Sequence, residues 1–122
     1  MGEGEGVTKS ESEIQSEIML EASKRGHRLF RSNAGTIQTK HGGVVKLYPR
    51  GYPDLTGFRK GDGKFVVIEV KKPSGRLSEH QKKFAEWAST QPILYGVARS
   101  SSEAINIVED EEWRKKFGNQ VK

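Results

Sequence analysis

The chain has 122 residues, a length that suits one compact domain built around a single hydrophobic core. It contains no cysteine, which excludes disulfide bonds, thiolate catalysis and cysteine-bound zinc. Hydrophobic residues make up 33% of the chain, and no apolar run is long enough to span a membrane. The sequence also lacks the basic start and following apolar stretch of a secretory signal. We therefore expect a soluble, cytoplasmic protein with no membrane partner.

Positive charge is concentrated in the middle of the chain. The net charge is +5, but residues 24–83 hold 15 Lys and Arg against 4 Asp and Glu. A basic stretch of this kind is typical of proteins that contact phosphate backbones. A solvated basic surface, or a face that docks on an acidic protein, would give the same composition.

The first third of the chain is predicted to contain a tail, a helix, a strand and a hairpin. Residues 1–10 are rich in Gly and lack apolar periodicity, which is typical of a flexible tail. Apolar positions at helical spacing predict an amphipathic helix over residues 10–25, ended by Gly26. Residues 27–33 favour a short strand, and the runs TIQTK and VVKLY that follow favour a basic hairpin.

A second hairpin and two helical regions are predicted further along. The runs DLTGFR and FVVIEVK surround Gly-Asp-Gly at positions 61–63, a strong turn signal. Ser78 and Gln81 predict a capping box at the start of a helix. The residues expected on its buried face are Phe84, Ala85, Trp87 and Ala88. The run ILYGVA favours a strand, and residues 100–117, opened by a second capping box, favour a C-terminal helical region before a tail at 118–122.

The second hairpin is predicted to bring two carboxylates together. If the chain turns at positions 61–63, partners on the two strands have numbers that sum to between 123 and 125, so Asp54 faces the segment from Glu69 to Lys71. Side chains alternate along a strand, so Glu69 and Lys71 share a face. Carboxylates on opposed positions, with Cβ atoms about 5 Å apart, suit one small hard cation such as Mg²⁺.

Glu69 interrupts the most apolar run in the chain. An ionised carboxylate is costly in such a place unless a cation or hydrogen bonds compensate it. A structural salt bridge to Lys71 is one interpretation, and an Asp that follows Pro, as Asp54 does, is commonly a turn former. The other interpretation is phosphodiester hydrolysis, in which a cation activates water and Lys71 orients it.

These residues resemble the motif of a nuclease family. Pro53-Asp54 followed by Glu69-Val70-Lys71 matches the PD-(D/E)xK pattern. The wider match resembles the virus-type replication-repair nuclease (VRR-NUC) domain over about residues 11–98, through Glu11, Ile14, Gln15, Arg31, Asn33, Gly35, Ile68 to Pro73, Gly75 to Ser78, and Gln81. The resemblance implies an α/β (α+β) fold with a restriction-endonuclease-like core, a mixed β-sheet flanked by helices in the order α-β-β-β-α-β plus a C-terminal helix. It implies one nuclease domain over residues 11–117.

The resemblance also implies roles for the residues at the hairpin. Asp54 and Glu69 would be metal ligands together with the carbonyl of Val70, and Lys71 would be the catalytic lysine. Gln81 would lie close to the active site as well as capping its helix.

The first helix is expected to supply a further acid. Many relatives carry a glutamate where this chain has Gln15. Glu11, one turn earlier on the same face, is the preferred candidate, and Glu17 is close by. The basic residues expected to contact DNA are Arg31, Arg50, Lys72, Arg76, Lys82 and Lys83. The three histidines show no metal-ligand spacing and receive no role.

Members of the family are metal-dependent DNA nucleases, and small stand-alone phage versions resemble homodimeric endonucleases that resolve Holliday junctions. The resemblance therefore implies Mg²⁺ or Mn²⁺ as cofactor, DNA, in particular branched DNA, as substrate, and a homodimer. It also implies phage-type replication or repair in a bacterial or phage-infected cell. The alternative is a nucleic-acid-binding module that kept the scaffold without the activity, which Gln15 leaves open.

Overall fold

The computed structural model describes residues 8–32, 36–46 and 48–117, so most of both predicted tails lies outside the described residues. The helices are α1 (Glu11–Lys24), α2 (Glu79–Ala88), α3 (Ser101–Glu109) and α4 (Glu111–Phe117). The strands are β1 (Arg28–Arg31), β2 (Thr36–Gln38), β3 (Val44–Lys46), β4 (Leu55–Phe58), β5 (Phe65–Val70) and β6 (Leu94–Ala98). None of the helices within the described ranges is long and apolar enough to cross a membrane.

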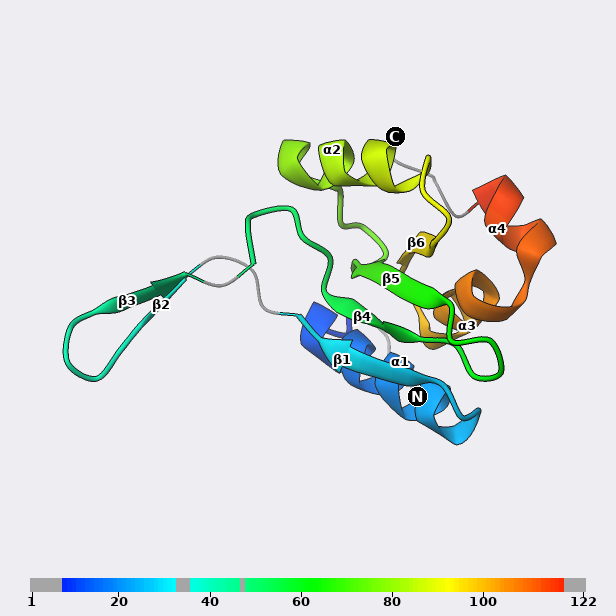
Figure 1. Ribbon diagram of the computed structural model, residues 1–122, viewed down its shortest axis with the longest axis horizontal. Coiled ribbons are helices and arrows are strands. Elements are labelled where there is room, and N and C mark those ends of the chain that lie inside the picture. Colours follow the sequence, from blue (N-terminus) through cyan, green and yellow to red (C-terminus); the bar gives the residue numbers. More distant parts are fainter. Residues whose placement is uncertain (1–7, 33–35, 47, 118–122) are drawn as a thin grey trace.

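Four strands form one mixed sheet in the order β1-β4-β5-β6. The β1–β4 and β4–β5 pairs are antiparallel, whereas β5 and β6 are parallel. Helices α1 and α3 pack on one face of this sheet and α2 packs on the other (Figure 1). Strands β2 and β3 form a separate two-stranded sheet. The predicted mixed sheet flanked by helices is confirmed.

The turn between β4 and β5 sets the register of the central hairpin. Gly61 and Gly63 have φ angles of 99° and 68°, in the region that glycine adopts without strain. Asp62 lies between these two glycines. Its carboxylate accepts a hydrogen bond from the backbone N–H of Lys64, just before β5, at 3.1 Å. In each β4–β5 pair the two residue numbers sum to 123, which confirms the register predicted from the turn.

Strand β5 is buried on both faces. Val66, Ile68 and Val70 belong to the core under α1 and α3, while Val67 belongs to the smaller core under α2. Because side chains alternate, Glu69 shares the α2-facing side with Val67. The strand thus carries one carboxylate into the interior beside α2.

The predicted capping box of α2 is confirmed. Ser78 Oγ accepts from the N–H of Gln81 at 3.2 Å, and Gln81 Oε1 accepts from the N–H of Ser78 at 2.8 Å. At α3, Ser100 Oγ accepts from the N–H of Glu103, as predicted. The Glu103 carboxylate, however, accepts from the N–H of Arg99 at 2.8 Å, so the predicted reciprocal bond to Ser100 is replaced by one to the preceding residue.

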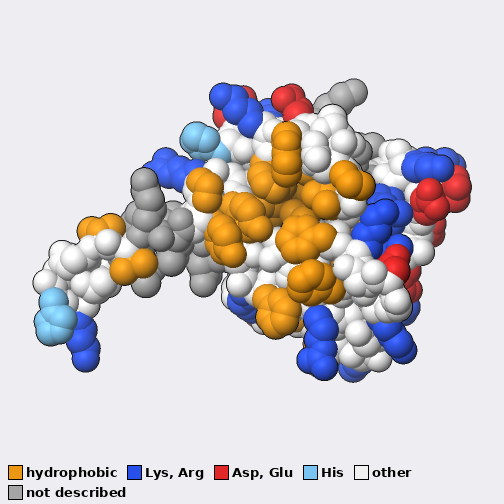
Figure 2. Space-filling model, in the orientation of Figure 1, with side chains coloured by type: hydrophobic (Ala, Val, Ile, Leu, Met, Phe, Trp, Pro, Cys, Tyr) orange, Lys and Arg blue, Asp and Glu red, His pale blue; other side chains and the backbone are white. Residues whose placement is uncertain are grey.

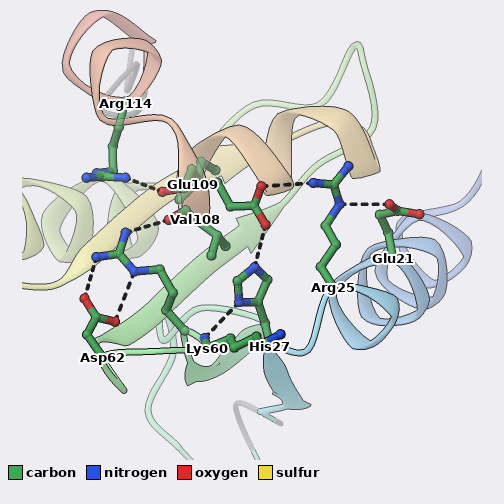
Figure 3. A network of polar contacts seen from close by, with 10 residues as sticks. Glu21, Arg25, His27, Lys60, Asp62, Val108, Glu109 and Arg114 are labelled. Carbon is green, nitrogen blue, oxygen red and sulfur yellow. Dashed lines mark hydrogen bonds and ion pairs between the residues drawn. The ribbon is translucent and has the colours of Figure 1, made fainter.

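His27 anchors a polar network at the opposite end of the central hairpin from Asp54. Its Nδ1 accepts from the backbone N–H of Lys60 at 2.9 Å, and its Nε2 lies 2.7 Å from Glu109 Oε2. Because Nδ1 accepts, Nε2 is the ring nitrogen that donates to Glu109. Arg25 also donates to Glu109, over 2.9 Å. Figure 3 shows how this network joins the β4–β5 turn to the end of α1 and to α3.

One expectation was wrong, and the predicted C-terminal helical region proved to contain two helices. Trp87 was assigned to the buried face of α2, but its side chain is 56% exposed and its ring packs edge-on against Phe84. The C-terminal helical region is divided in two at Asp110, whose backbone is extended. The Oδ1 atom of Asp110 accepts from the N–H of Trp113 at 3.0 Å and so caps the start of α4.

Candidate active site

Asp54 and Glu69 lie side by side at the open end of the β4–β5 hairpin. The ladder runs to the pair of Leu55 with Ile68, and one further step places Asp54 opposite Glu69. Asp54 Oδ2 accepts a hydrogen bond from the N–H of Val70 at 2.9 Å, which holds the carboxylate against β5. The structure therefore brings the two predicted carboxylates together.

Pro53 explains why the carbonyl of Val70 is available beside them. The N–H and C=O groups of one strand residue point to the same edge, and the Val70 N–H bonds to Asp54 on the β4 side. The backbone N–H of Arg59 donates to the carbonyl of Lys64 at 2.9 Å. Odd-numbered residues of β4 and even-numbered residues of β5 therefore form the hydrogen-bonded pairs of this hairpin. The paired ladder ends at Leu55 and Ile68, and its continuation would place Val70 opposite Pro53, which has no N–H to donate. On that continuation, Pro53 would offer no ladder donor to the Val70 carbonyl.

Glu69 is a buried acid with an unusual electrostatic environment. Its side chain is 2% exposed, and its Oε2 accepts a hydrogen bond from Gln81 Nε2 at 2.9 Å. Burial, and after it the neighbouring Asp54 carboxylate, raise the pKa of Glu69 to about 9. A divalent cation would offset both causes, because it supplies positive charge to both carboxylates at once.

Lys71 lies between an acid of the sheet and an acid of α1. Its Nζ is 3.9 Å from Glu69 Oε2 and 4.0 Å from Glu11 Oε2. The Lys71 stem passes Gly75, where a Cβ atom would come within 3.3 Å of Lys71 Cδ. Arg99 holds this loop in place, since its Nη2 donates to the carbonyl of Gly75 at 2.7 Å. The ammonium is therefore positioned by the backbone around it as well as by the acids.

The three candidates for the acid of α1 have different neighbours. Glu11 is the one whose carboxylate reaches Lys71. Gln15 Oε1 accepts from Arg31 Nη1 at 2.7 Å, which occupies the amide in a contact with β1. Glu17 forms an ion pair of 2.6 Å with a lysine that precedes the helix. Of these three, Glu11 fits the site best.

The donors at this site are oxygen atoms. Within the described part of the chain, no three His, Cys, Asp or Glu side chains form a group that could hold a metal ion. The atoms that could hold one are the carboxylates of Asp54 and Glu69 and the carbonyl of Val70. Mg²⁺ is commonly bound through one or two carboxylates, with water and substrate phosphate as its other ligands. The donor set therefore fits a hard cation that is bound together with its substrate.

The six basic residues expected to contact DNA differ in their surroundings. Four of them are exposed and form no ion pair with another described residue: Arg50, Lys72, Arg76 and Lys83. Lys82 Nζ lies 3.6 Å from Glu79 Oε2. Arg31 is engaged within the protein, because its guanidinium donates to the side chains of Gln15 and Ser16 at 2.7 Å each. Arg31 thus ties β1 to α1, the helix that carries Glu11.

The geometry agrees with the comparison against known families. The family model of the VRR-NUC domain matches residues 9–102. The chain belongs to the VRR-NUC domain family. The match spans the whole site from Glu11 to Arg99, and the VRR-NUC domain implies a nuclease-type function and, with it, DNA binding. No curated protein matches this VRR-NUC chain significantly.

Two residues that shape this VRR-NUC site were not identified from the sequence. Arg99 follows the buried strand β6 directly, and a charged residue in that position was the available signal. Pro53 was identified only as part of the PD-(D/E)xK pattern, without a structural role. Its effect on Val70 depends on which residues of the two strands form hydrogen-bonded pairs. The prediction left this open, because it allowed the paired residue numbers to sum to any value from 123 to 125.

Proposed function

We propose that this VRR-NUC protein is a DNA endonuclease that hydrolyses phosphodiester bonds with Mg²⁺ or Mn²⁺ held by Asp54 and Glu69. The observation that carries the proposal is the convergence of these two carboxylates with the Lys71 ammonium at the end of β5. A purely structural salt bridge between Lys71 and Glu69 explains this convergence less well. A dominant ion pair would lower the pKa of Glu69, whereas burial and Asp54 outweigh Lys71 and raise it.

Each residue of the site has a role in in-line hydrolysis. A divalent cation held by Asp54 and Glu69 would make water a better nucleophile and would neutralise charge on the phosphate. Lys71 orients the attacking water and stabilises the negative charge that develops on the phosphate oxygens. Gln81 fixes the carboxylate of Glu69. The water oxygen bonds to phosphorus, the bond from phosphorus to the 3′-oxygen breaks, and that oxygen takes up a proton. The products are 5′-phosphate and 3′-hydroxyl ends.

The protein is proposed to act as a homodimer. The support is an aromatic face on the α2 side of the sheet, defined by Phe30, Phe58 and Phe65. Phe30 is 57% exposed and Phe58 is 50% exposed, and the ring of Phe58 packs edge-on against Phe65. Figure 2 shows hydrophobic side chains gathered over the middle of this face, with basic side chains around them. Exposed apolar patches with a polar rim are typical of protein interfaces.

Branched DNA is the proposed substrate. A two-fold symmetric dimer would present two equivalent sites, which suits the cutting of two strands at one branch. The exposed basic residues around each site, Lys72, Arg76 and Lys83, would contact phosphates that flank the cut. Phage-type replication or repair in the cytoplasm of a bacterial or infected cell is the proposed setting.

The alternative, a binding module without activity, rested on Gln15. In the structure the Gln15 amide bonds to Arg31, while Glu11 lies beside Lys71. Glu11, one turn before Gln15 on α1, can therefore supply the acid that Gln15 lacks. This favours the nuclease over the inactive module.

A cleavage assay tests the proposal. The purified protein is incubated with end-labelled four-way junctions, flaps, duplexes and single strands, each with Mg²⁺, Mn²⁺ or EDTA. The proposal predicts cleavage with either metal, none with EDTA, and the highest rate on branched DNA. Extension of the products by a polymerase checks for 3′-hydroxyl ends. Tight binding to every substrate without any cleavage would favour the inactive module instead.

A further inference from the structure

The β2–β3 hairpin forms an arm outside the body of the molecule. Its strands pair with each other and not with the four-stranded sheet. Figure 1 shows the arm extending away from the helices and the sheet. Its turn is well specified, because Thr39 N–H donates to the carbonyl of Gly43 at 2.8 Å and Thr39 Oγ1 accepts from the N–H of Gly43 at 2.9 Å. The arm is therefore a defined hairpin with little support from the core.

The arm exposes side chains that a partner would be expected to cover. Val44 is 69% exposed and Val45 is 42% exposed, and as neighbours on β3 they point to opposite faces of the arm. A two-stranded hairpin alone in water is marginally stable. Contact with a partner would stabilise the arm from both sides.

The charge of the arm indicates which partner fits. Residues 36–52 include three Lys or Arg and no Asp or Glu. Lys40 and His41 are exposed in the turn, and Lys40 forms no ion pair with any residue that the structure describes. Figure 2 shows a histidine and a basic side chain at the tip of the arm. This surface complements a phosphate backbone, which carries a negative charge at each nucleotide.

The loop that joins the arm to Asp54 packs against the helix that carries Gln81. Gly51, with φ of 88°, lies so close to α2 that a Cβ atom there would come within 2.6 Å of the carbonyl of His80. The ring of Tyr52 packs edge-on against Phe84 of the same helix, with centroids 5.6 Å apart. The loop between the arm and Asp54 is thus packed against the element that also holds Glu69.

We propose that the β2–β3 arm binds the DNA duplex beside the scissile phosphate, with Lys40 and His41 against backbone phosphates. This inference rests on the proposed nuclease function. Strand β3 ends eight residues before Asp54, so the base of the arm lies within about 28 Å of the carboxylates, at roughly 3.5 Å per residue. That reach is shorter than one turn of B-DNA, about 34 Å. The major groove, about 12 Å wide, admits a two-stranded ribbon.

The test compares two lysines that each lie in a hairpin turn. The arm variant is Lys40→Gln with His41→Gln, and the control is Lys64→Gln, an exposed lysine in the β4–β5 turn. Binding to labelled duplex and junction is measured by fluorescence anisotropy in EDTA over a salt series. The arm variant should bind several-fold more weakly, and its log–log salt slope should be shallower by about 0.9 per lost phosphate contact. The control should match the wild type.

Further measurements separate the arm from the chemistry. With Mg²⁺, the arm variant should need several-fold more DNA than the wild type to reach half-maximal cleavage, whereas the Lys64→Gln control should not. Equal DNA affinity and salt slope for the arm variant and the control would overturn the proposal for the arm. A lower molar mass in solution for the arm variant than for the wild type would also overturn it, because the arm would then contact a second copy of the chain. A wild type that binds through the arm but cleaves no DNA would overturn the nuclease proposal alone.

Discussion

Gln81 donates a hydrogen bond of 2.9 Å to Glu69 through the same side chain whose carbonyl oxygen closes the capping box of α2. Because Gln81 Oε1 accepts from the N–H of Ser78, the amide nitrogen is the atom left to face Glu69. The start of α2 and the buried carboxylate are therefore held by one residue. Changes at this position can separate the two roles.

Gln81→Glu should reduce cleavage while preserving the helix cap. Glu is as suitable as Gln in a capping box, but it has no amide N–H to donate to Glu69 and it adds a negative charge there. Loss of a hydrogen bond to a charged group, worth about 1.5–3 kcal/mol, corresponds to roughly a 10- to 100-fold lower single-turnover rate. Gln81→Ala is the matched control for the cap, because it should also lower the free energy of unfolding by about 1 kcal/mol. A wild-type rate for Gln81→Glu would show that Glu69 does not need this donor.

Glu69→Gln should abolish cleavage and yet stabilise the metal-free protein. The raised pKa means that folded Glu69 keeps a proton that the unfolded chain loses, so the free energy of unfolding of the wild type falls as pH rises toward about 9. Gln removes this dependence. At about pH 8 in EDTA the variant should be more stable by on the order of 2 kcal/mol.

Urea unfolding at about pH 5 and about pH 8, with EDTA or Mg²⁺, measures these differences. The stability gap between Glu69→Gln and the wild type should widen at the higher pH. Mg²⁺ should stabilise the wild type more than the variant, because it binds the ionised carboxylate pair. A gap that narrows as pH rises would contradict the raised pKa of Glu69.

Pro53→Ala should weaken the metal site. Alanine restores a backbone N–H at position 53, which the continued β4–β5 register would place opposite Val70, where it could occupy the carbonyl that we assign to the cation. We expect half-maximal cleavage to require several-fold more Mg²⁺, with a smaller change in rate when Mg²⁺ is saturating. Pro92→Ala, at an exposed proline before β6, is the matched control. If both variants keep the wild-type Mg²⁺ dependence, the Val70 carbonyl is not a ligand.

Phe58→Glu should convert the proposed dimer to a monomer. The charge would lie at the centre of the aromatic face, where Phe58 is 50% exposed and contacts Phe65. Phe117→Glu, on α4, is the control, since that ring is 46% exposed but belongs to a different surface. Light scattering after size exclusion gives the molar mass of each protein. A monomeric wild type, or a Phe58→Glu variant that stays dimeric, would assign the aromatic face another role.

The order of elements and the central register could be predicted because their causes are local. The Gly-Asp-Gly turn specifies the β4–β5 pairing, and Ser78 with Gln81 specifies the start of α2. The turn brings Asp54 beside Glu69, whereas the position of Gln81 near Glu69 was implied by the family resemblance.

The missed features depend on contacts between distant segments. Helical spacing placed Trp87 on the apolar side of α2, but in the fold its ring packs edge-on against Phe84 and the side chain stays 56% exposed. A single histidine has no spacing to reveal it, and His27 acquires its partners only when residues 60 and 109 meet it in the fold. Likewise, Glu11 and Gln15 lie on neighbouring turns, and only the positions of their tertiary partners separate them.

The central claim is that Glu69 and Lys71 carry out chemistry on DNA that other residues bind. Single-turnover cleavage of a labelled junction with Mg²⁺, measured beside DNA affinity in EDTA, tests it for Glu69→Ala and Lys71→Ala. We predict at least about a 100-fold loss of rate in each variant, since each removes charge stabilisation at the reacting phosphate. The affinity should change little, because exposed basic residues supply it. Wild-type cleavage by both variants would contradict the assignment of the active site.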